Sequence, residues 1–291
     1  LLDTPGHVDF TGEMERTLWV LDYGILVISG SDGVQSHTRT LWNLLKRYEI
    51  PVFLFINKMD MEKADRKALL GELQSILGDG CVSFDGERDE AFYESLATGS
   101  EEALEEFLDT GFVGEDTICR LIKNRQIFPC YFGSALKVEG VDTFLQGFLQ
   151  YAKEPDRREE FSAKIFKIAR DKAGNRLTYG KITGGSLKVK DMVYHLKVRT
   201  LLGEEKVNQI RIYSGENFET AEEALPGMVC AFTGLKNSFA GECVGGEDKA
   251  YLPASEPVLS YRIMLPEEVS PLKMLPKLKE LEEEDPLLHI Q

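Results

Sequence analysis

Residues 51–60 read PVFLFINKMD, a short apolar run that leads directly into a polar turn. A continuous apolar run of this length is typical of a parallel strand that is covered on both faces. A similar run, GILVISG at 24–30, precedes it, and residues 35–48 between the two runs place leucines at helical spacing. Together the three segments predict a β-α-β unit.

This unit continues into a larger α/β domain. The run IFPCYF at 127–132 is followed by a helical pattern over 141–152, which predicts an open parallel sheet with crossover helices. Residues 79–116 hold 13 acidic side chains against one base and read as short helices. We therefore expect an α/β domain over 1–153, with a helical, acidic insertion at about 63–125.

The second half of the chain has a different pattern. The charged stretch KEPDRREE at 153–160 contains a proline and has no apolar periodicity, which is typical of a linker. Short alternating strands with Gly and Asn turns follow over 161–254 and predict an antiparallel β-barrel. Residues 257–291 then begin an α+β domain, with an expected strand at 257–263 and a helix at 271–284 whose leucine stripe we expect in a core.

The formal net charge of −15 argues against a nucleic-acid partner, because phosphates are bound through Lys and Arg. The charge is unevenly distributed, however, since residues 161–199 hold ten bases against two acids. This basic stretch is a candidate RNA contact, and the alternative is a solvated face of the barrel. Its bases are Lys164, Lys167, Arg170, Lys172, Arg176, Lys181, Lys188, Lys190, Lys197 and Arg199.

The cysteines and the apolar runs bear on where the protein works. The five cysteines lie far apart and form no CxxC pair, which favours reduced thiols in a core over zinc ligands or disulfides. No apolar run approaches the roughly 20 residues that a membrane-spanning helix needs. We expect a cytoplasmic monomer with no membrane partner.

Two polar turns follow apolar runs and carry groups suited to recognise a guanine base. In NKMD, the Asp60 carboxylate can accept two hydrogens from the guanine N1 and N2 edge, while Asn57 ties loops together and the Lys58 stem covers the ring. In GSALK at 133–137, small residues would let backbone N–H groups reach the guanine carbonyl oxygen. The alternative for each motif is an ordinary turn between a strand and a helix.

A third turn, DTPGH at 3–7, has the chemistry of a phosphate site. Asp3 at a strand end can hold a magnesium ion through water, and Gly6 lets a backbone N–H approach a γ-phosphate closely, beside His7. Taken alone, the segment is also a good turn. The order of the three motifs, each at the carboxyl end of an expected parallel strand, favours a nucleotide site, because open α/β sheets bind ligands there.

These motifs resemble the translational GTPases of the elongation factor G class. The resemblance rests on DTPGHVDF, DGVQSHTR, NKMD and GSALK, then on YGKITGGSLKVKDMV and LPGMVCAFTGL of a second, β-barrel domain, and on EPVLSYRI and LKELEEEDPLLHI of a third. It implies a P-loop-type GTPase domain that uses GTP, GDP and Mg²⁺ and acts on the ribosome, with both ribosomal RNA and ribosomal proteins as partners. The short segment between the two base motifs looks most like that of the tetracycline-resistance ribosomal protection proteins. The alternatives are an elongation factor G-like translocase and a non-catalytic ribosome-binding fragment.

The same resemblance assigns roles to individual residues. His7 would orient the attacking water, Asp3 would help to hold magnesium, and Gly6 would contact the γ-phosphate. The base pocket would consist of Asn57, Lys58, Asp60, Ser134, Ala135 and Leu136.

One expected motif is missing from the 291 residues. No GxxxxGK[ST] sequence occurs, although this loop supplies most of the phosphate contacts in P-loop proteins. We therefore expect an N-terminally truncated fragment of a GTPase, in which the P-loop and the first switch segment would precede Leu1. Such a chain should be inactive alone.

Overall fold

The computed structural model divides the chain into two compact units. One unit is Leu21–Pro155, and the other combines Leu1–Val20 with Asp156–Gln291. The residues described are 1–4, 11–62, 64–155, 157–197, 200–246, 259–266 and 268–290. Side-chain burial is described for all of these except 11–13, 195–197 and 200–202.

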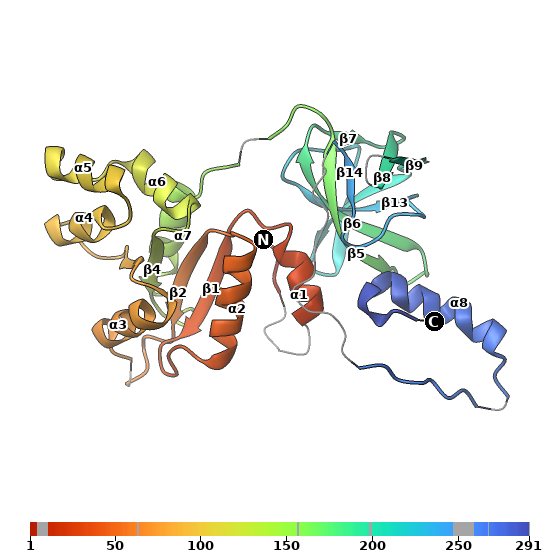
Figure 1. Cartoon of the computed structure of the whole chain (residues 1–291), viewed down its shortest axis with the longest axis horizontal. Coiled ribbons are helices and arrows are strands. Elements are labelled where there is room, and N and C mark those ends of the chain that lie inside the picture. Colours follow the sequence, from red (N-terminus) through yellow and green to blue (C-terminus); the bar gives the residue numbers. More distant parts are fainter. Residues whose placement is uncertain are drawn as a thin grey trace. The chain divides into compact units, whose positions relative to one another are not determined.

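The unit Leu21–Pro155 is built on a parallel sheet (Figure 1). Its strand order is β1-β2-β4-β3, and each neighbouring pair is parallel. The strands are β1 (Gly24–Ser29), β2 (Val52–Asn57), β3 (Cys81–Ser83) and β4 (Phe128–Phe132). The open parallel sheet with crossover helices is thus confirmed.

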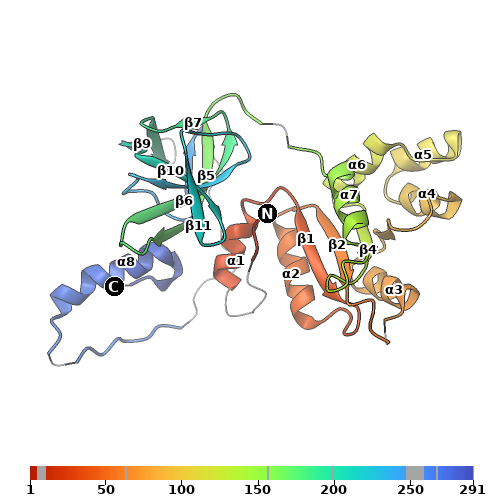
Figure 2. The same ribbon diagram turned by 180° about the vertical axis from the view of Figure 1, so that it is seen from behind.

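Six helices accompany this sheet. They are α2 (Ser36–Arg47), α3 (Arg66–Leu77), α4 (Glu90–Ala97), α5 (Glu101–Thr110), α6 (Glu115–Lys123) and α7 (Val141–Tyr151). Three of them start at side-chain caps, in which Asp65, Asp89 and Ser100 accept backbone N–H groups of the first turn. Figures 1 and 2 show α4, α5 and α6 gathered beyond the β4 side of the sheet.

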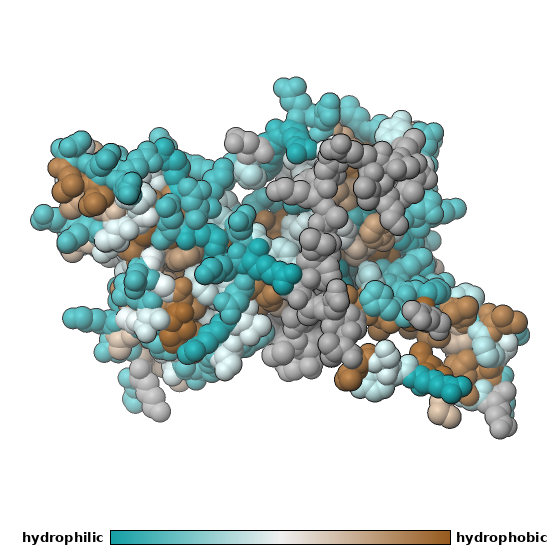
Figure 3. Space-filling model, viewed as in Figure 1, coloured by the Kyte–Doolittle hydropathy of each residue, from teal (hydrophilic) through white to brown (hydrophobic). Residues whose placement is uncertain are grey.

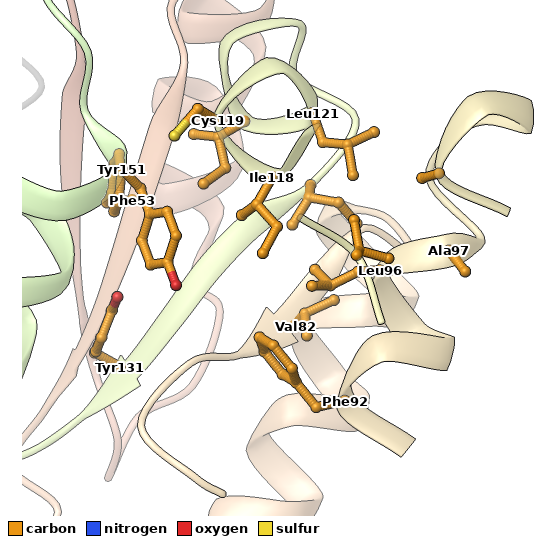
Figure 4. Close-up of a cluster of buried hydrophobic side chains, with 14 of the residues drawn as sticks. Phe53, Val82, Phe92, Leu96, Ala97, Ile118, Cys119, Leu121, Tyr131 and Tyr151 are labelled. Carbon is orange, nitrogen blue, oxygen red and sulfur yellow. The ribbon is translucent and has the colours of Figure 1, made fainter. Parts of the chain in front are cut away.

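A core of aromatic side chains joins the sheet to these helices. The Phe144 ring of α7 lies 5.3 Å from the Phe55 ring and 5.4 Å from the Tyr131 ring, measured between centroids. Figure 4 shows residues of α4 and α6, such as Leu96 and Leu121, in the same buried cluster. The acidic helical segment therefore packs as part of this unit, with most of its charged side chains on the surface.

All five cysteines are free and buried, which confirms their interpretation as core thiols. Burial raises the pKa of the Cys230 thiol to about 11. A thiol held neutral in this way is a poor nucleophile, so Cys230 contributes packing.

The second unit contains an eight-stranded sheet in the order β11-β10-β13-β6-β5-β14-β8-β9. Every strand pair in it is antiparallel, as the alternating pattern predicts, while closure into a barrel stays a prediction. Its strands are β5 (Ser162–Arg170), β6 (Arg176–Gly184), β8 (Met192–Lys197), β9 (Thr200–Lys206), β10 (Gln209–Ser214), β11 (Asn217–Ala221), β13 (Val229–Thr233) and β14 (Cys243–Gly245). The short strands β7 (Leu187–Lys188) and β12 (Glu223–Ala224) form a separate pair.

The described part of this second unit contains two α-helices. Helix α1 (Thr11–Leu18) contacts β5, and α8 (Pro271–Glu284) contacts β5 as well. A short 3₁₀ turn, η2 (Pro286–Leu288), follows α8. Among the described residues, no helix is long and apolar enough to cross a bilayer.

Helix α8 has the predicted bounds, but the expected burial of its leucine stripe is wrong. Leu272 is 85% exposed and Leu281 is 52% exposed, and apolar side chains are visible along α8 in Figure 3. The charged side of the helix is held instead, because Glu283 pairs with Arg170 and Arg176 of the sheet. The expected strand at 257–263 is also wrong in its described part, since residues 259–266 form neither helix nor strand.

Candidate guanine-nucleotide site

The carboxyl ends of three parallel strands meet at one edge of the sheet. The Gly30 N–H, just after β1, donates to the Asn57 carbonyl oxygen at 2.7 Å. After β2, the Met59 N–H donates to the Gly133 carbonyl oxygen at 3.0 Å, and the Gly133 N–H donates to the Ile56 carbonyl oxygen at 2.9 Å. The fold thereby brings NKMD and GSALK together, although 73 residues separate Asp60 from Ser134.

The Asn57 side chain joins the two loops. Its Oδ1 accepts the Lys58 N–H at 2.8 Å and the Ala135 N–H at 2.8 Å. Lys58 has a φ of 63°, a left-handed conformation that is uncommon outside glycine. The amide oxygen thus stabilises both a strained turn and the neighbouring loop, which is the role that the sequence predicts for this asparagine.

The Asp60 carboxylate lies beside the second loop. One oxygen is 3.7 Å from the Lys137 ammonium nitrogen, and the side chain is 17% exposed. A hydrogen bond from Ser134 is the main cause that lowers the pKa of Asp60, and Lys137 adds to it. The group is therefore ionised at neutral pH, as an acceptor for the N–H groups of a guanine edge must be.

Glycines and a buried serine shape the GSALK loop. A Cβ on Gly133 would lie 2.2 Å from the Glu139 carbonyl oxygen, so only glycine fits this position without a backbone shift. Ser134 is buried, and its N–H and carbonyl group are paired with Glu139. Ala135 and Leu136 follow at the tip of the loop, and the Leu136 side chain is 91% exposed. The tip of the loop is therefore exposed to solvent.

The structure adds a polar cluster that the sequence analysis did not identify. The Ser29 hydroxyl donates to the Asp32 carboxylate at 2.6 Å and also contacts the Ser31 hydroxyl at 3.0 Å. The Ser29 hydrogen bond lowers the pKa of Asp32, and the charge of Lys58 contributes. This cluster follows β1 and lies at the same sheet edge as NKMD, a position that the strand end alone could have indicated.

The DTPGH segment is described only at its start, and the expected strand end before Asp3 is wrong, because residues 1–4 form neither helix nor strand. Asp3 is exposed, whereas Gly6 and His7 lie outside the described residues. A carboxylate is a suitable magnesium ligand, but the described residues contain no group of three or more side chains that could hold a metal ion. They do not by themselves fit a complete magnesium site.

Much of the basic stretch 161–199 is engaged within the second unit. Lys181 is 7% exposed and donates to the Val20 carbonyl oxygen at 2.8 Å, and the Lys164 ammonium lies 5.2 Å from the centre of the Trp19 ring. Lys188 lies 4.0 Å from Glu223. Several of these bases therefore serve the fold.

Arginines of this stretch are anchored in the same way. Arg176 donates to the Leu235 carbonyl oxygen at 2.6 Å, to the Ser238 hydroxyl at 3.0 Å and to Glu283 at 3.1 Å. Lys172, which is almost fully exposed, lies 3.5 Å from the equally exposed Glu216. Arg199 and the Lys197 side chain lie outside the described residues.

The fold and the grouped loops define a nucleotide-binding α/β domain followed by an antiparallel β unit. Residues 1–154 match the family described as the elongation factor Tu GTP binding domain, and residues 160–244 match elongation factor G domain 2. Because the first match covers more than half of the chain, the chain belongs to the family of that GTP-binding domain. Its domain order is that of translational GTPases of the elongation factor G type.

Individual relatives support this assignment. The chain is 26% identical to proteins named elongation factor G from Ureaplasma parvum serovar 3 and Ureaplasma urealyticum serovar 10, over 98% of the chain and 52% of each relative. A solved protein from Thermus thermophilus has the same fold, with a TM-score of 0.78 and 21% identity, over 98% of this chain and 50% of that one. The chain thus spans about half the length of the relatives it matches.

Proposed function

We propose that the protein binds GTP and GDP at the β1-β2-β4 sheet edge and couples GTP hydrolysis to remodelling of the ribosome. The observation that carries the proposal is the Asn57 side chain, which joins NKMD to GSALK through hydrogen bonds of 2.8 Å to Lys58 N and Ala135 N. This link sets Asp60 and the exposed loop tip at Ala135 and Leu136 on one edge of the sheet.

Each group at this edge has a part in base recognition. The Asp60 carboxylate accepts the N1 and N2 hydrogens of guanine, which adenine cannot offer. The loop tip at Ala135 and Leu136 approaches the guanine carbonyl oxygen with the Leu136 N–H as the donor, because Asn57 holds the Ala135 N–H. The Lys58 stem covers one face of the ring. The hydrogen bond from Ser134 positions the Asp60 carboxylate and lowers its pKa.

For hydrolysis, the resemblance assigns DTPGH to the phosphates. His7 would orient the attacking water, Gly6 would contact the γ-phosphate and Asp3 would hold magnesium. Because the 291 residues contain no GxxxxGK[ST] loop, we expect this chain to bind GTP weakly and not to hydrolyse it. Phosphate release above the uncatalysed rate by the purified chain would overturn that expectation.

On the ribosome, tetracycline protection is the finer proposal, drawn from the short segment between the base motifs. The names of the relatives favour the second candidate, an elongation factor G-like translocase. A non-catalytic ribosome-binding module is the third.

The first test is base-selective binding by the purified chain. Ligand-observed NMR detects weak binding, so GDP should show contact with the protein where ADP at the same concentration does not. Equal signals from GDP and ADP, or none from either, would contradict a guanine site at this edge.

The second test addresses the ribosome. The full open reading frame that contains this sequence, expressed in tetracycline-sensitive bacteria, should raise the tolerated drug concentration if its product is a protection protein. Unchanged tolerance, together with restored growth of a strain depleted of its elongation factor G, would support the translocase instead. If neither effect is observed and the chain still co-sediments with ribosomes, the result supports the non-catalytic ribosome-binding module.

A further inference from the structure

Directly after β3, the Asp85 side chain lies in the interior although it carries a charge. It is 7% exposed. Its carboxylate accepts the Phe132 N–H at 3.0 Å and the Ser83 hydroxyl at 2.8 Å, and it forms an ion pair with Arg66. A buried carboxylate with this many partners is held in one orientation, because each lost partner would leave a desolvated charge.

The partners of Asp85 belong to the two base-recognition loops. Arg66 opens α3, six residues after Asp60 at the end of NKMD. Phe132 ends β4 and directly precedes Gly133 of GSALK. The Arg66 guanidinium also lies 4.9 Å from the centre of the Phe132 ring. Asp85 therefore links the chain that leaves the first loop to the chain that enters the second.

The link replaces a strand-to-strand hydrogen bond. The parallel pairing of β3 and β4 continues to Phe84, whose N–H donates to the Cys130 carbonyl oxygen at 2.9 Å. At the next step the Asp85 carboxylate, and not a backbone carbonyl, accepts the Phe132 N–H. Side-chain geometry thus decides where the last residue of β4 lies.

We propose that Asp85 is a positioning residue of the guanine site, acting with Arg66 to set the spacing between NKMD and GSALK. The inference rests on the proposed function only in taking these loops as the base site. Asn57 links the two loops directly. The Asp85–Arg66 pair links the segments of chain that flank them. Asp85 lies five residues before Glu90, where α4 begins. The same ion pair therefore also connects the start of the helices α4, α5 and α6 to the nucleotide site.

The decisive experiment is amide hydrogen exchange on the purified chain without nucleotide. In Asp85→Ala, amides of 57–60 and 132–137 should exchange about tenfold faster, as expected for loss of a hydrogen bond to a charged acceptor. Amides of α7, at 144–151, should keep their wild-type rates. Asp85→Asn retains one acceptor oxygen and should show a smaller increase at the same positions.

Glu87→Gln is the matched control, since it removes one negative charge from an exposed position two residues away. It should exchange like the wild type. Loop amides that are unchanged in Asp85→Ala would overturn the proposal, and so would an equal increase at 144–151, because that would mark a general loss of stability.

A second measurement separates this inference from the proposed function. GDP binding to Asp85→Ala, followed by ligand-observed NMR, should weaken about tenfold relative to Glu87→Gln. Wild-type GDP affinity in Asp85→Ala would overturn the positioning role. If the wild-type chain itself shows no guanine preference, the proposed function fails, and the exchange data still decide whether Asp85 positions the loops.

Discussion

The two base-recognition loops, NKMD and GSALK, and the basic stretch at 161–199 were both identified from the sequence. In the structure the two loops lie together as expected, whereas several residues of the basic stretch are used within the fold. In NKMD and GSALK, two segments far apart in the chain are joined by Asn57 as the motifs predict. In the basic stretch, Lys181 is buried and Arg176 is bound to acceptors of the same unit. A motif specifies the geometry of its own residues, whereas a charge count leaves open which charges the fold itself uses.

The largest expected effect concerns the base preference set by Asp60 in NKMD. Asp60→Asn should reverse the base preference, because the amide can donate to the xanthine O2 where the carboxylate accepted the guanine N2 hydrogens. With about 1.5–3 kcal/mol for each hydrogen bond to a charged group, the GDP to xanthosine diphosphate ratio should change by about 100-fold or more. Competition between the two nucleotides in ligand-observed NMR measures it. Asp79→Asn, a residue just before β3, is the control and should keep the guanine preference.

The next effect concerns Arg176, which the charge count placed among RNA-facing bases. Arg176→Met should lower the free energy of unfolding by about 2–3 kcal/mol, because it leaves several partly buried acceptors unpaired. Lys172→Met removes an exposed pair and should change it by less than about 0.5 kcal/mol. Urea unfolding of both variants measures the difference. Equal stabilities would show that Arg176 is available to a partner after all.

A smaller effect tests the link between the loops. Asn57→Ala removes the acceptor for Lys58 N and Ala135 N and should lower the free energy of unfolding by about 1–2 kcal/mol. Amide exchange should rise at Ala135 more than in β1. Asn124→Ala, at the exposed C-terminal end of α6, serves as the control. Unchanged exchange at Ala135 would mean that the loop does not depend on Asn57.

The smallest expected effect concerns ribosome binding by two exposed lysines of the basic stretch. The double variant Lys188→Glu and Lys190→Glu reverses two exposed bases of the stretch. If they contact ribosomal RNA, co-sedimentation with ribosomes should weaken several-fold at low salt, and the salt dependence of binding should become shallower by about two units of slope. The double variant Lys273→Glu and Lys277→Glu, which reverses two exposed lysines outside the stretch, is the matched control and should leave binding unchanged. Binding that is unaltered at every salt concentration would remove the pair from the interface.

The leucines of α8, like the basic stretch, form a sequence pattern whose tertiary contacts the sequence did not predict. Leucines recur every three residues along α8, among them Leu272, Leu275 and Leu281, and the sequence pattern predicted the helix bounds correctly. Their burial could not be read from that spacing, because amphipathicity shows which side of a helix is apolar and not what covers it. In the described residues Glu283 pairs with Arg176 of the sheet, while these three leucines are exposed.

The sequence by itself determined the parallel sheet, its crossover helices and the position of NKMD and GSALK at strand ends. These features depend on local apolar runs and turn residues, which a single sequence records directly. Asp85 could not be found in that way. Its importance comes from Arg66 and Phe132, which lie 19 residues before it and 47 residues after it in the chain. Only the tertiary structure brings these groups together, because the hydrogen bonds that fix the loops run between segments whose proximity depends on the register of β3 against β4.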